Sequence, residues 1–296
     1  MEPPIDPPLF VASLIVFGIL LASFALWIKH FRRPKNIVRE MASENSVPAW
    51  NIGWVNFGIF ICALATAVFA VQSIASSLFL EPSDGLEDPL ALTPSLAIFA
   101  VLSLQLPMLA VFYAARRFYP GHYASELNGV DLASSDALRN AAPLFLMFLP
   151  LIWIASLVWT NVLGAFQTIG WIEEIQQQEL VTLFQNGGNL VTMLLLVTLA
   201  VIMAPIVEEI IFRGCIYRFL KSQTSFLVAQ IVSGCIFSLM HANLLSFVPL
   251  ILVGILLARI YERTGSLKAS IWFHALFNAF SLIMLFITSM SEVIPQ

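Results

Sequence analysis

Three charged side chains lie close together inside a long apolar stretch, in the segment Ala-Pro-Ile-Val-Glu208-Glu209-Ile-Ile-Phe-Arg213. Each ionisable residue at the centre of a membrane helix costs about 2.5–3.5 kcal/mol, so three isolated in lipid would cost on the order of 8–10 kcal/mol. Glu209 and Arg213 are four residues apart and share one helix face, where they can form an ion pair. Glu208 is turned about 100° away. A desolvated carboxylate without a partner is suited to take a proton from water, as a general base does.

Two further polar pairs interrupt later apolar stretches. Phe237 and His241 are four residues apart, as are His274 and Asn278, so each pair lies on one helix face. At ~1.5 Å of rise per residue from the inner turns, these groups and Glu208 lie at compatible depths, so they can meet. Two simpler interpretations stay open. The charged stretch could protrude into the lipid headgroups, and a histidine on an apolar helix is usually a packing residue with a partner.

The residue types fit the activation of water for hydrolysis. Glu208 would take the proton, and His241 would order the water or share the proton. His274 and Asn278 would donate hydrogen bonds to a developing oxyanion. The sequence contains no HExxH and no GxSG motif, and its five aspartates fall in loops, so serine-type and paired-aspartate proteolysis lack their residues.

Two other functions remain open at this point. Zinc could bind His241, His274 and a glutamate, although no short-spaced pair of ligands anchors such a site. A non-catalytic membrane scaffold, chaperone or transporter would use the same polar groups to bind a partner or to carry protons. We expect hydrolysis without a cofactor or a bound metal, with zinc as the alternative.

The composition indicates that the polar side chains of these three motifs lie on membrane helices. The 296 residues are 59% hydrophobic and only 11% charged, against about 25% charged in soluble proteins. A spanning helix needs about 20 mostly apolar residues, and eight stretches are candidates, of which the seventh is short. We therefore expect an all-α polytopic membrane bundle of about eight transmembrane helices. The expected spans are residues 9–28, 54–80, 96–115, 143–166, 190–212, 226–245, 247–261 and 267–287.

The positive charges predict the orientation of these spans. All 14 Lys and Arg fall on one side, at the end of the first, third, fifth and seventh spans or in the loops that follow them. The positive-inside rule makes that side cytoplasmic and places both termini outside. We expect a multi-pass protein of the cell membrane, with the lipid bilayer and a membrane-associated peptide or protein substrate as partners. The net charge of −4 argues against a nucleic acid partner.

The remaining segments divide the chain into two parts. We expect residues 1–188 to hold the first four transmembrane helices with their loops, and residues 189–289 to hold the last four with the chemistry. Residues 167–186 have apolar side chains near helical spacing, which predicts an interfacial helix on the outer surface. Residues 118–140 form a polar loop or a short surface helix. The acidic start favours a retained anchor over a cleaved signal peptide, and three cysteines without CxxC spacing indicate core residues.

The three motifs resemble those of the CAAX protease and bacteriocin-processing (CPBP) family. These proteins are intramembrane glutamic endopeptidases and include the eukaryotic Ras-converting CAAX endopeptidase. The resemblance covers about residues 189–289. The family pattern EExxxR, FxxxH and HxxxN stands here, in order, as Glu208-Glu209-Ile-Ile-Phe-Arg213, Phe237-Ser-Leu-Met-His241 and His274-Ala-Leu-Phe-Asn278.

The resemblance implies an endopeptidase that acts on membrane-associated substrates near the cytoplasmic side. Eukaryotic relatives cleave CAAX-type proteins, whereas bacteriocin-like peptides, pheromones or membrane regulators are equally suitable for bacterial members. The flanking Arg213-Gly214 and the stretch at residues 264–267 look bacterial, which implies the bacterial cytoplasmic membrane. The implied roles agree with those above: Glu208 as base, Glu209 with Arg213 as its supporting pair, His241 as water-positioning partner, and His274 with Asn278 on the oxyanion side.

Overall fold

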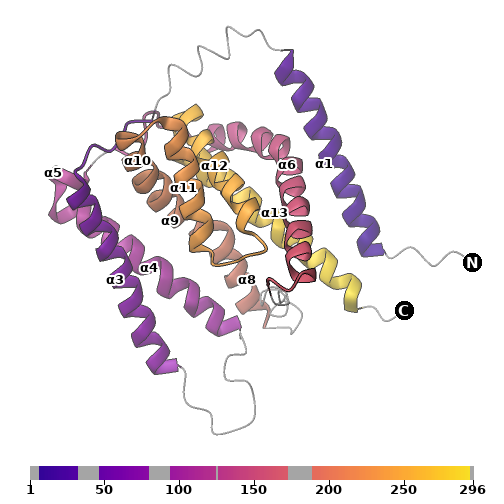
Figure 1. Ribbon diagram of the computed structural model, residues 1–296, viewed down its shortest axis with the longest axis horizontal. Helices are drawn as coiled ribbons and strands as arrows, with labels where there is room; N and C mark the ends of the chain where they lie inside the picture. Colours follow the sequence, from indigo (N-terminus) through magenta and orange to yellow (C-terminus); the bar gives the residue numbers. More distant parts are fainter. Residues whose placement is uncertain (1–6, 33–46, 80–93, 125, 173–188, 294–296) are drawn as a thin grey trace, which may run out of the picture.

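The computed structural model describes residues 7–32, 47–79, 94–124, 126–172 and 189–293. These residues are mostly helical and include no strand, which confirms the all-α class (Figure 1). The helices are α1 (Pro7–Phe31), α3 (Trp54–Phe79), α4 (Pro94–Phe118), α5 (Pro120–Tyr123), α6 (Ser134–Thr168), α8 (Leu190–Thr198), η1 (Leu199–Met203), α9 (Ala204–Glu208), η2 (Glu209–Tyr217), α10 (Arg218–Gln223), α11 (Phe226–Met240), α12 (Phe247–Thr264) and α13 (Leu267–Val293).

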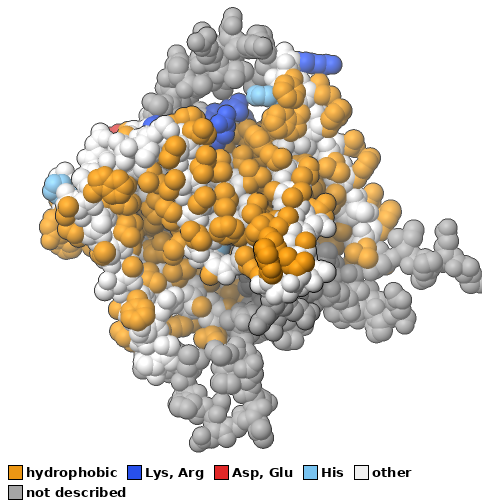
Figure 2. Space-filling view, viewed as in Figure 1, with side chains coloured by type: hydrophobic (Ala, Val, Ile, Leu, Met, Phe, Trp, Pro, Cys, Tyr) orange, Lys and Arg blue, Asp and Glu red, His pale blue; other side chains and the backbone are white. Residues whose placement is uncertain are grey.

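Among the described residues, six helical segments are long and apolar enough to cross a membrane. Apolar side chains cover most of the face shown in Figure 2, as expected where lipid replaces water around the protein. The molecule is therefore a multi-pass membrane helical bundle. The two other predicted spans are also helical but shorter, since α11 has 15 residues and α12 has 18. The six segments are Pro7–Phe31, Trp54–Ser77, Pro94–Phe118, Ser134–Thr168, Leu190–Gln223 and Leu267–Met290.

Two helix ends differ from the hydropathy-based expectation. α6 begins at Ser134 and not at residue 143, because Ala137 and Ala141 are fully buried and continue its packing face beyond the apolar stretch. α11 ends at Met240 and not at residue 245, because the chain turns at Ala242, whose φ is 47°. Tertiary packing and turn geometry decide these ends, and neither is visible in an average of apolarity.

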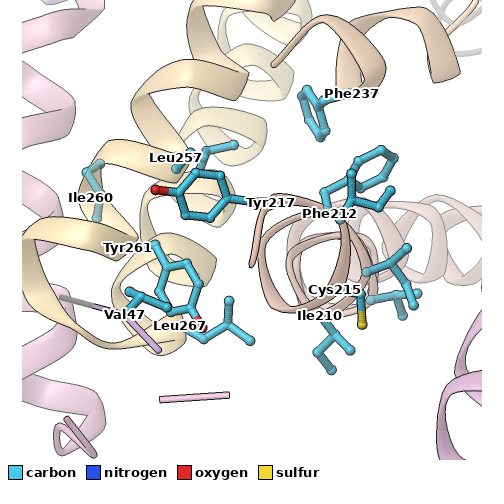
Figure 3. Close-up of a cluster of buried hydrophobic side chains, with 14 of the residues drawn as sticks. Val47, Ile210, Phe212, Cys215, Tyr217, Phe237, Leu257, Ile260, Tyr261 and Leu267 are labelled. Atoms are coloured by element: carbon cyan, nitrogen blue, oxygen red, sulfur yellow. The ribbon is translucent and has the colours of Figure 1, made fainter. Parts of the chain in front are cut away.

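A close crossing of α11 and α12 forms the centre of the C-terminal part. A Cβ on Gly254 would lie 2.7 Å from the Cα of Gly234, so the two backbones are in direct contact. Small residues permit this approach between membrane helices, where van der Waals packing replaces the hydrophobic effect as the source of association. Figure 3 shows buried side chains of η2, α11 and α12 that belong to the hydrophobic core.

The segment before α3 is fastened to α10 by backbone and side-chain hydrogen bonds. Trp50 N donates to the carbonyl of Arg218 at 3.1 Å, and Arg218 Nε donates to the carbonyl of Pro48 at 2.6 Å. Lys221 Nζ lies 2.7 Å from the carbonyl of Val47 and 2.6 Å from Oε1 of Glu262 on α12. Residues 47–52 therefore join α3 to the segment that carries the three motifs.

The loop before α6 is fastened to the turn between α12 and α13. Gly129 N and Val130 N both donate to the carbonyl of Gly265, at 2.9 and 3.0 Å. Gly265 has φ 66°, a left-handed conformation that glycine adopts without strain and that ends α12. Leu267 N donates to Oδ1 of Asn128 at 2.7 Å, so this loop also caps the start of α13.

Two predicted loop features have different outcomes. Residues 118–140 contain the short helix α5 and the first turns of α6, so this part of the chain is partly helical. The predicted interfacial helix at residues 167–186 falls largely outside the described residues, because α6 ends at Thr168 and the described chain resumes at residue 189.

We expect Gly254→Ala to lower the stability of the protein by about 1–3 kcal/mol, because the new methyl group would force the backbones of α11 and α12 apart. Thermal unfolding of the purified protein in detergent measures the effect. Gly58→Ala in α3 is the matched control, since nothing lies within 4 Å of its Cβ. An equal melting temperature for Gly254→Ala and Gly58→Ala would contradict the close crossing.

Candidate active site

Four helical elements of the C-terminal part carry the predicted site. Glu208 ends α9, and Glu209 and Arg213 follow in η2. His241 lies at the C-terminal end of α11, and His274 lies in α13. η2 packs against both α11 and α13, and Figure 1 shows these elements at the centre of the bundle. Residues from three separate motifs therefore face one another.

A widened helical stretch, η1, precedes the first motif. Ala204 N donates to the carbonyl of Leu199, five residues back, in the pattern of a π-helix. Pro205 has no N–H, so the carbonyl of Ala200 lacks the donor that the widened pattern would supply. Asn278 Nδ2 on α13 donates to that carbonyl at 2.9 Å. Asn278 therefore satisfies a backbone acceptor that the local helix geometry leaves open.

Glu209 and Arg213 form a fully buried ion pair. Both side chains are 0% exposed, and Arg213 Nη1 lies 2.8 Å from Glu209 Oε1. Arg213 Nη2 donates to the carbonyl of Gly254 at 3.1 Å, and the guanidinium carbon lies 4.4 Å from the centre of the Phe237 ring. Ser270 Oγ donates to the other oxygen of Glu209 at 2.5 Å. Such additional hydrogen bonds are what make a buried charge pair tolerable.

The two histidines converge on Glu208. His274 Nδ1 lies 3.1 Å from Glu209 Oε1, and its Nε2 lies 3.8 Å from Glu208 Oε2. His241 Nδ1 lies 2.7 Å from the carbonyl of Phe237, and its Nε2 lies 3.9 Å from the same Glu208 oxygen. That oxygen is buried and has no hydrogen-bond partner among the described residues. Glu208 is therefore the carboxylate of this cluster that remains open to a ligand.

The hydrogen bonds of the histidines determine what they present to Glu208. A backbone carbonyl and a carboxylate can only accept, so Nδ1 is the donor in both His241 and His274. In the neutral imidazole, Nε2 is then an acceptor. Three acceptor atoms thus face one another: Oε2 of Glu208 and Nε2 of both histidines. A ligand that fits between them must donate hydrogen bonds or carry positive charge. Within the described ranges, no group of three His, Cys, Asp or Glu side chains is arranged to hold a metal ion.

The ring of Phe237 forms one wall of this cluster. Its centre lies 4.6 Å from that of His241 and 5.6 Å from that of His274. Glu208 and His241 keep 17% and 32% of their side chains exposed, whereas His274 keeps 3%. The site is therefore reached from the side of His241, at the end of α11.

The structure brings five of the six predicted site residues into one contact network. Glu208, Glu209, Arg213, His241 and His274 are linked by the distances above. Asn278 is bonded to Ala200, in the helical stretch that leads to the network.

Sequence reasoning missed two groups that hold the ion pair. Ser270 stands one turn before His274 on the same helix face, and this spacing was an available signal. The role of the Gly254 carbonyl had no signal in the sequence, because a backbone group accepts the hydrogen bond from Arg213 and every residue has such a group.

The segment that forms this site is similar in sequence to membrane endopeptidases of the CAAX type. Residues 190–280 match the family described as "Type II CAAX prenyl endopeptidase Rce1-like", which confirms over this segment the resemblance to the CPBP proteins. The matched residues include all three motifs and exclude the first four predicted spans.

Two curated relatives match a similar length of chain. "Putative membrane peptidase YdiL" of Bacillus subtilis (strain 168) is 36% identical over 90 residues, which is 30% of this chain and 37% of that protein. The UPF0177 protein YaiH of Lactococcus lactis subsp. lactis (strain IL1403) is 40% identical over 82 residues, 26% of this chain and 32% of that protein. The chain thus covers about a third of the length of each relative. No solved structure matches.

We expect Arg213→Ala to reduce the amount of folded, membrane-inserted protein, because it leaves Glu209 as an unpaired buried charge, a loss of about 3–5 kcal/mol. Combining Arg213→Ala with Glu209→Gln should recover part of this loss. Fluorescence-detected size exclusion of the expressed protein measures both effects. Arg139→Ala, which removes one half of an exposed ion pair with Asp136, is the control for lost positive charge. A double variant that is no better than Arg213→Ala would show that the two charges are not buried together.

We expect Asn278→Ala to destabilise the protein by about 1–3 kcal/mol, because the carbonyl of Ala200 loses its donor inside the bundle. Thermal unfolding in detergent checks this. Asn161→Ala in α6 is the control, since that side chain donates to an exposed carbonyl within its own helix. Equal melting temperatures for the two variants would contradict a structural role for the bond to Ala200.

Proposed function

We propose that this protein is a membrane endopeptidase that hydrolyses peptide bonds with a water molecule activated by Glu208. The observation that carries the proposal is the buried Oε2 of Glu208, which has no hydrogen-bond partner in the described chain and faces Nε2 of both His241 and His274. Separations of 3.8 and 3.9 Å are too long for direct hydrogen bonds and suit a bridging water. A water among three acceptors donates its hydrogens to them and keeps its lone pairs for attack.

The reaction then follows from general base and general acid catalysis by one carboxylate. Glu208 takes a proton while the water oxygen bonds to the carbonyl carbon of the substrate, whose oxygen becomes an oxyanion. The carbon–nitrogen bond breaks as the oxyanion collapses, and Glu208 returns the proton to the leaving amine. The products are a carboxylic acid and an amine, and Glu208 ends in the state in which it began.

The surrounding groups have supporting roles in this mechanism. Glu209 holds His274 through Nδ1 and thereby directs Nε2 towards Glu208. Asn278 gives one amide hydrogen to Ala200 and has a second to give, and His274 can donate from Nε2 when it carries both ring protons. We assign these two side chains to the oxyanion, where one donor contributes typically ~2.7–4 kcal/mol.

The substrate class we propose is a membrane-associated peptide or protein. The matched family is described as a prenyl endopeptidase, which supports CAAX-type substrates. Bacteriocin- or pheromone-like peptides are the alternative that the resemblance to the CPBP family implies. The greater exposure of His241 favours entry of the peptide at the end of α11. The positive-inside pattern supports a cell membrane location with both termini outside.

A zinc-dependent membrane metalloprotease is the second candidate. Neutral imidazole nitrogens and a carboxylate oxygen are ligand types that Zn²⁺ takes, but no group of three such side chains is arranged to hold a metal ion in the part of the chain that the structure describes. In that case Glu208 would hold the metal together with His241 and His274, and the metal would supply the activation of water. The two candidates differ in their response to a chelator.

We expect Glu208→Gln to abolish proteolysis and leave the fold intact, because the amide keeps the shape of the side chain but cannot accept a proton. Proteomic comparison of cells carrying the wild-type protein and Glu208→Gln identifies an accumulated uncut substrate, and a peptide that spans its cut site provides the turnover assay. Turnover above about a hundredth of the wild-type rate would contradict the general-base role, since such catalysis contributes ~10²–10⁴. Exposed Glu126→Gln is the matched control.

The same assay separates the two candidates and tests the oxyanion donors. Treatment with a chelator leaves a glutamate-activated water enzyme unaffected, whereas loss of turnover that zinc restores identifies the metalloprotease. For Asn278→Ala, turnover for each folded molecule should fall by about 10²–10³. Normal turnover of the folded fraction would leave Asn278 with its structural bond alone.

A further inference from the structure

Two cavities adjoin between α1, α6 and α12, on the side of α12 away from the ion pair. Their volumes are about 340 and 360 Å³, and they share four lining residues. Each volume falls within the ~300–1,000 Å³ range of small-molecule sites. The shared residues are His30, Leu144, Met147 and Arg263.

The lining of this double cavity is amphipathic. Its apolar part comes from one face of each helix, and its rim carries basic side chains at the ends of α1 and α12 and at the start of α6. Figure 2 shows Lys and Arg side chains gathered at one end of an otherwise apolar face. The apolar residues include Leu26, Trp27, Phe148, Leu256 and Ile260, and the basic residues are Lys29, His30, Arg139, Arg259 and Arg263.

Three described acidic residues near the double cavity already have basic partners, and one of these partners, Arg139, belongs to the lining. Asp136 pairs with Arg139 at 3.4 Å, and Asp131 pairs with Lys268 at 2.8 Å. Glu262 on α12 binds Lys221 on α10. Lys29 and Arg259 form no ion pair within the described ranges. Two basic side chains thus border the double cavity without a described acidic partner.

The attachment of α1 leaves room for a ligand. Only 11% of its most apolar window is buried, and Figure 1 shows α1 at the edge of the bundle. Two polar ties hold it to α6, since Ser23 Oγ and Trp27 Nε1 each donate to the carbonyl of Met147 at 3.1 Å. The double cavity begins beside these ties, where Trp27 and Met147 line it. An amphipathic ligand there would contact all three helices.

We propose that the double cavity binds one anionic phospholipid, with an acyl chain against the apolar lining and the phosphate at Lys29 and Arg259. Phosphate is the anion that an arginine fork and a lysine ammonium both bind, and basic pockets between membrane helices at the cytoplasmic side bind anionic headgroups. A bilayer supplies such an amphipathic anion at the depth of the rim. The lipid fastens α1 to α6 and α12, and this inference is independent of the proposed proteolysis.

The test uses the full chain purified in detergent, with phosphatidylglycerol or phosphatidylcholine added to the micelles. A lipid that binds only the folded protein raises the melting temperature, and we expect phosphatidylglycerol to raise it by about 5 °C more than phosphatidylcholine does. Native mass spectrometry should show one retained phosphatidylglycerol. The Lys29→Gln/Arg259→Gln variant should lose most of both effects.

The matched control is Arg32→Gln/Arg117→Gln, which removes two exposed charges from the ends of α1 and α4 without touching the double cavity. It should keep the wild-type response. The proposal would be overturned if the two lipids stabilised the wild-type protein equally. It would also be overturned if the control lost as much of the response to phosphatidylglycerol as the Lys29→Gln/Arg259→Gln variant does. Stabilisation by inorganic phosphate alone would also overturn it and assign the site to a soluble anion. If the double variant does not fold, the single variants Lys29→Gln and Arg259→Gln should each retain less phosphatidylglycerol than the wild-type protein. Retention equal to wild type in both single variants would reject the site.

Discussion

The buried ion pair between Glu209 and Arg213 is the interaction on which the C-terminal part depends. Two opposite charges with no exposed surface are stable in a membrane only when further groups form hydrogen bonds with them. The carbonyl of Gly254 and the hydroxyl of Ser270 do this from α12 and α13, and the ring of Phe237 covers the guanidinium from α11. One charge pair therefore fixes where three other helices must lie.

This arrangement also explains why adjacent glutamates have different chemistry. Glu209 is committed on both oxygens to Arg213, Ser270 and His274, so it serves as a fixed anion. Glu208, one residue earlier, turns away from these donors, and its Oε2 faces Nε2 of two imidazoles. The helical rotation between neighbours thus separates a fully bonded carboxylate from one whose Oε2 has no hydrogen-bond partner among the described residues. The widened helix η1 before them leaves the carbonyl of Ala200 without a backbone donor, and Asn278 supplies one from α13.

Sequence reasoning was effective where periodicity and charge dominate. Long apolar stretches in a bilayer must form helices, so the fold class and most helix positions could be predicted. The four-residue spacing of Glu209 and Arg213 likewise placed both side chains on one helix face. The start of α6 and the end of α11 could not be read, because burial of small alanines and a left-handed turn decide them. Nor could the partner of Asn278, since a backbone carbonyl freed by Pro205 has no signature in the pattern of polar residues.

The sequence separations within the site have a consequence for synthesis at the ribosome. Arg213 lies within one helical turn of Glu209, so this ion pair can form inside the nascent helix before α11, α12 and α13 exist. His241 and His274 reach Glu208 only from helices made 33 and 66 residues later, by the difference of their sequence positions. The buried ion pair is thus completed locally and early, whereas the cluster around Glu208 is assembled from distant segments of the chain. That cluster is complete only after α13 has been made.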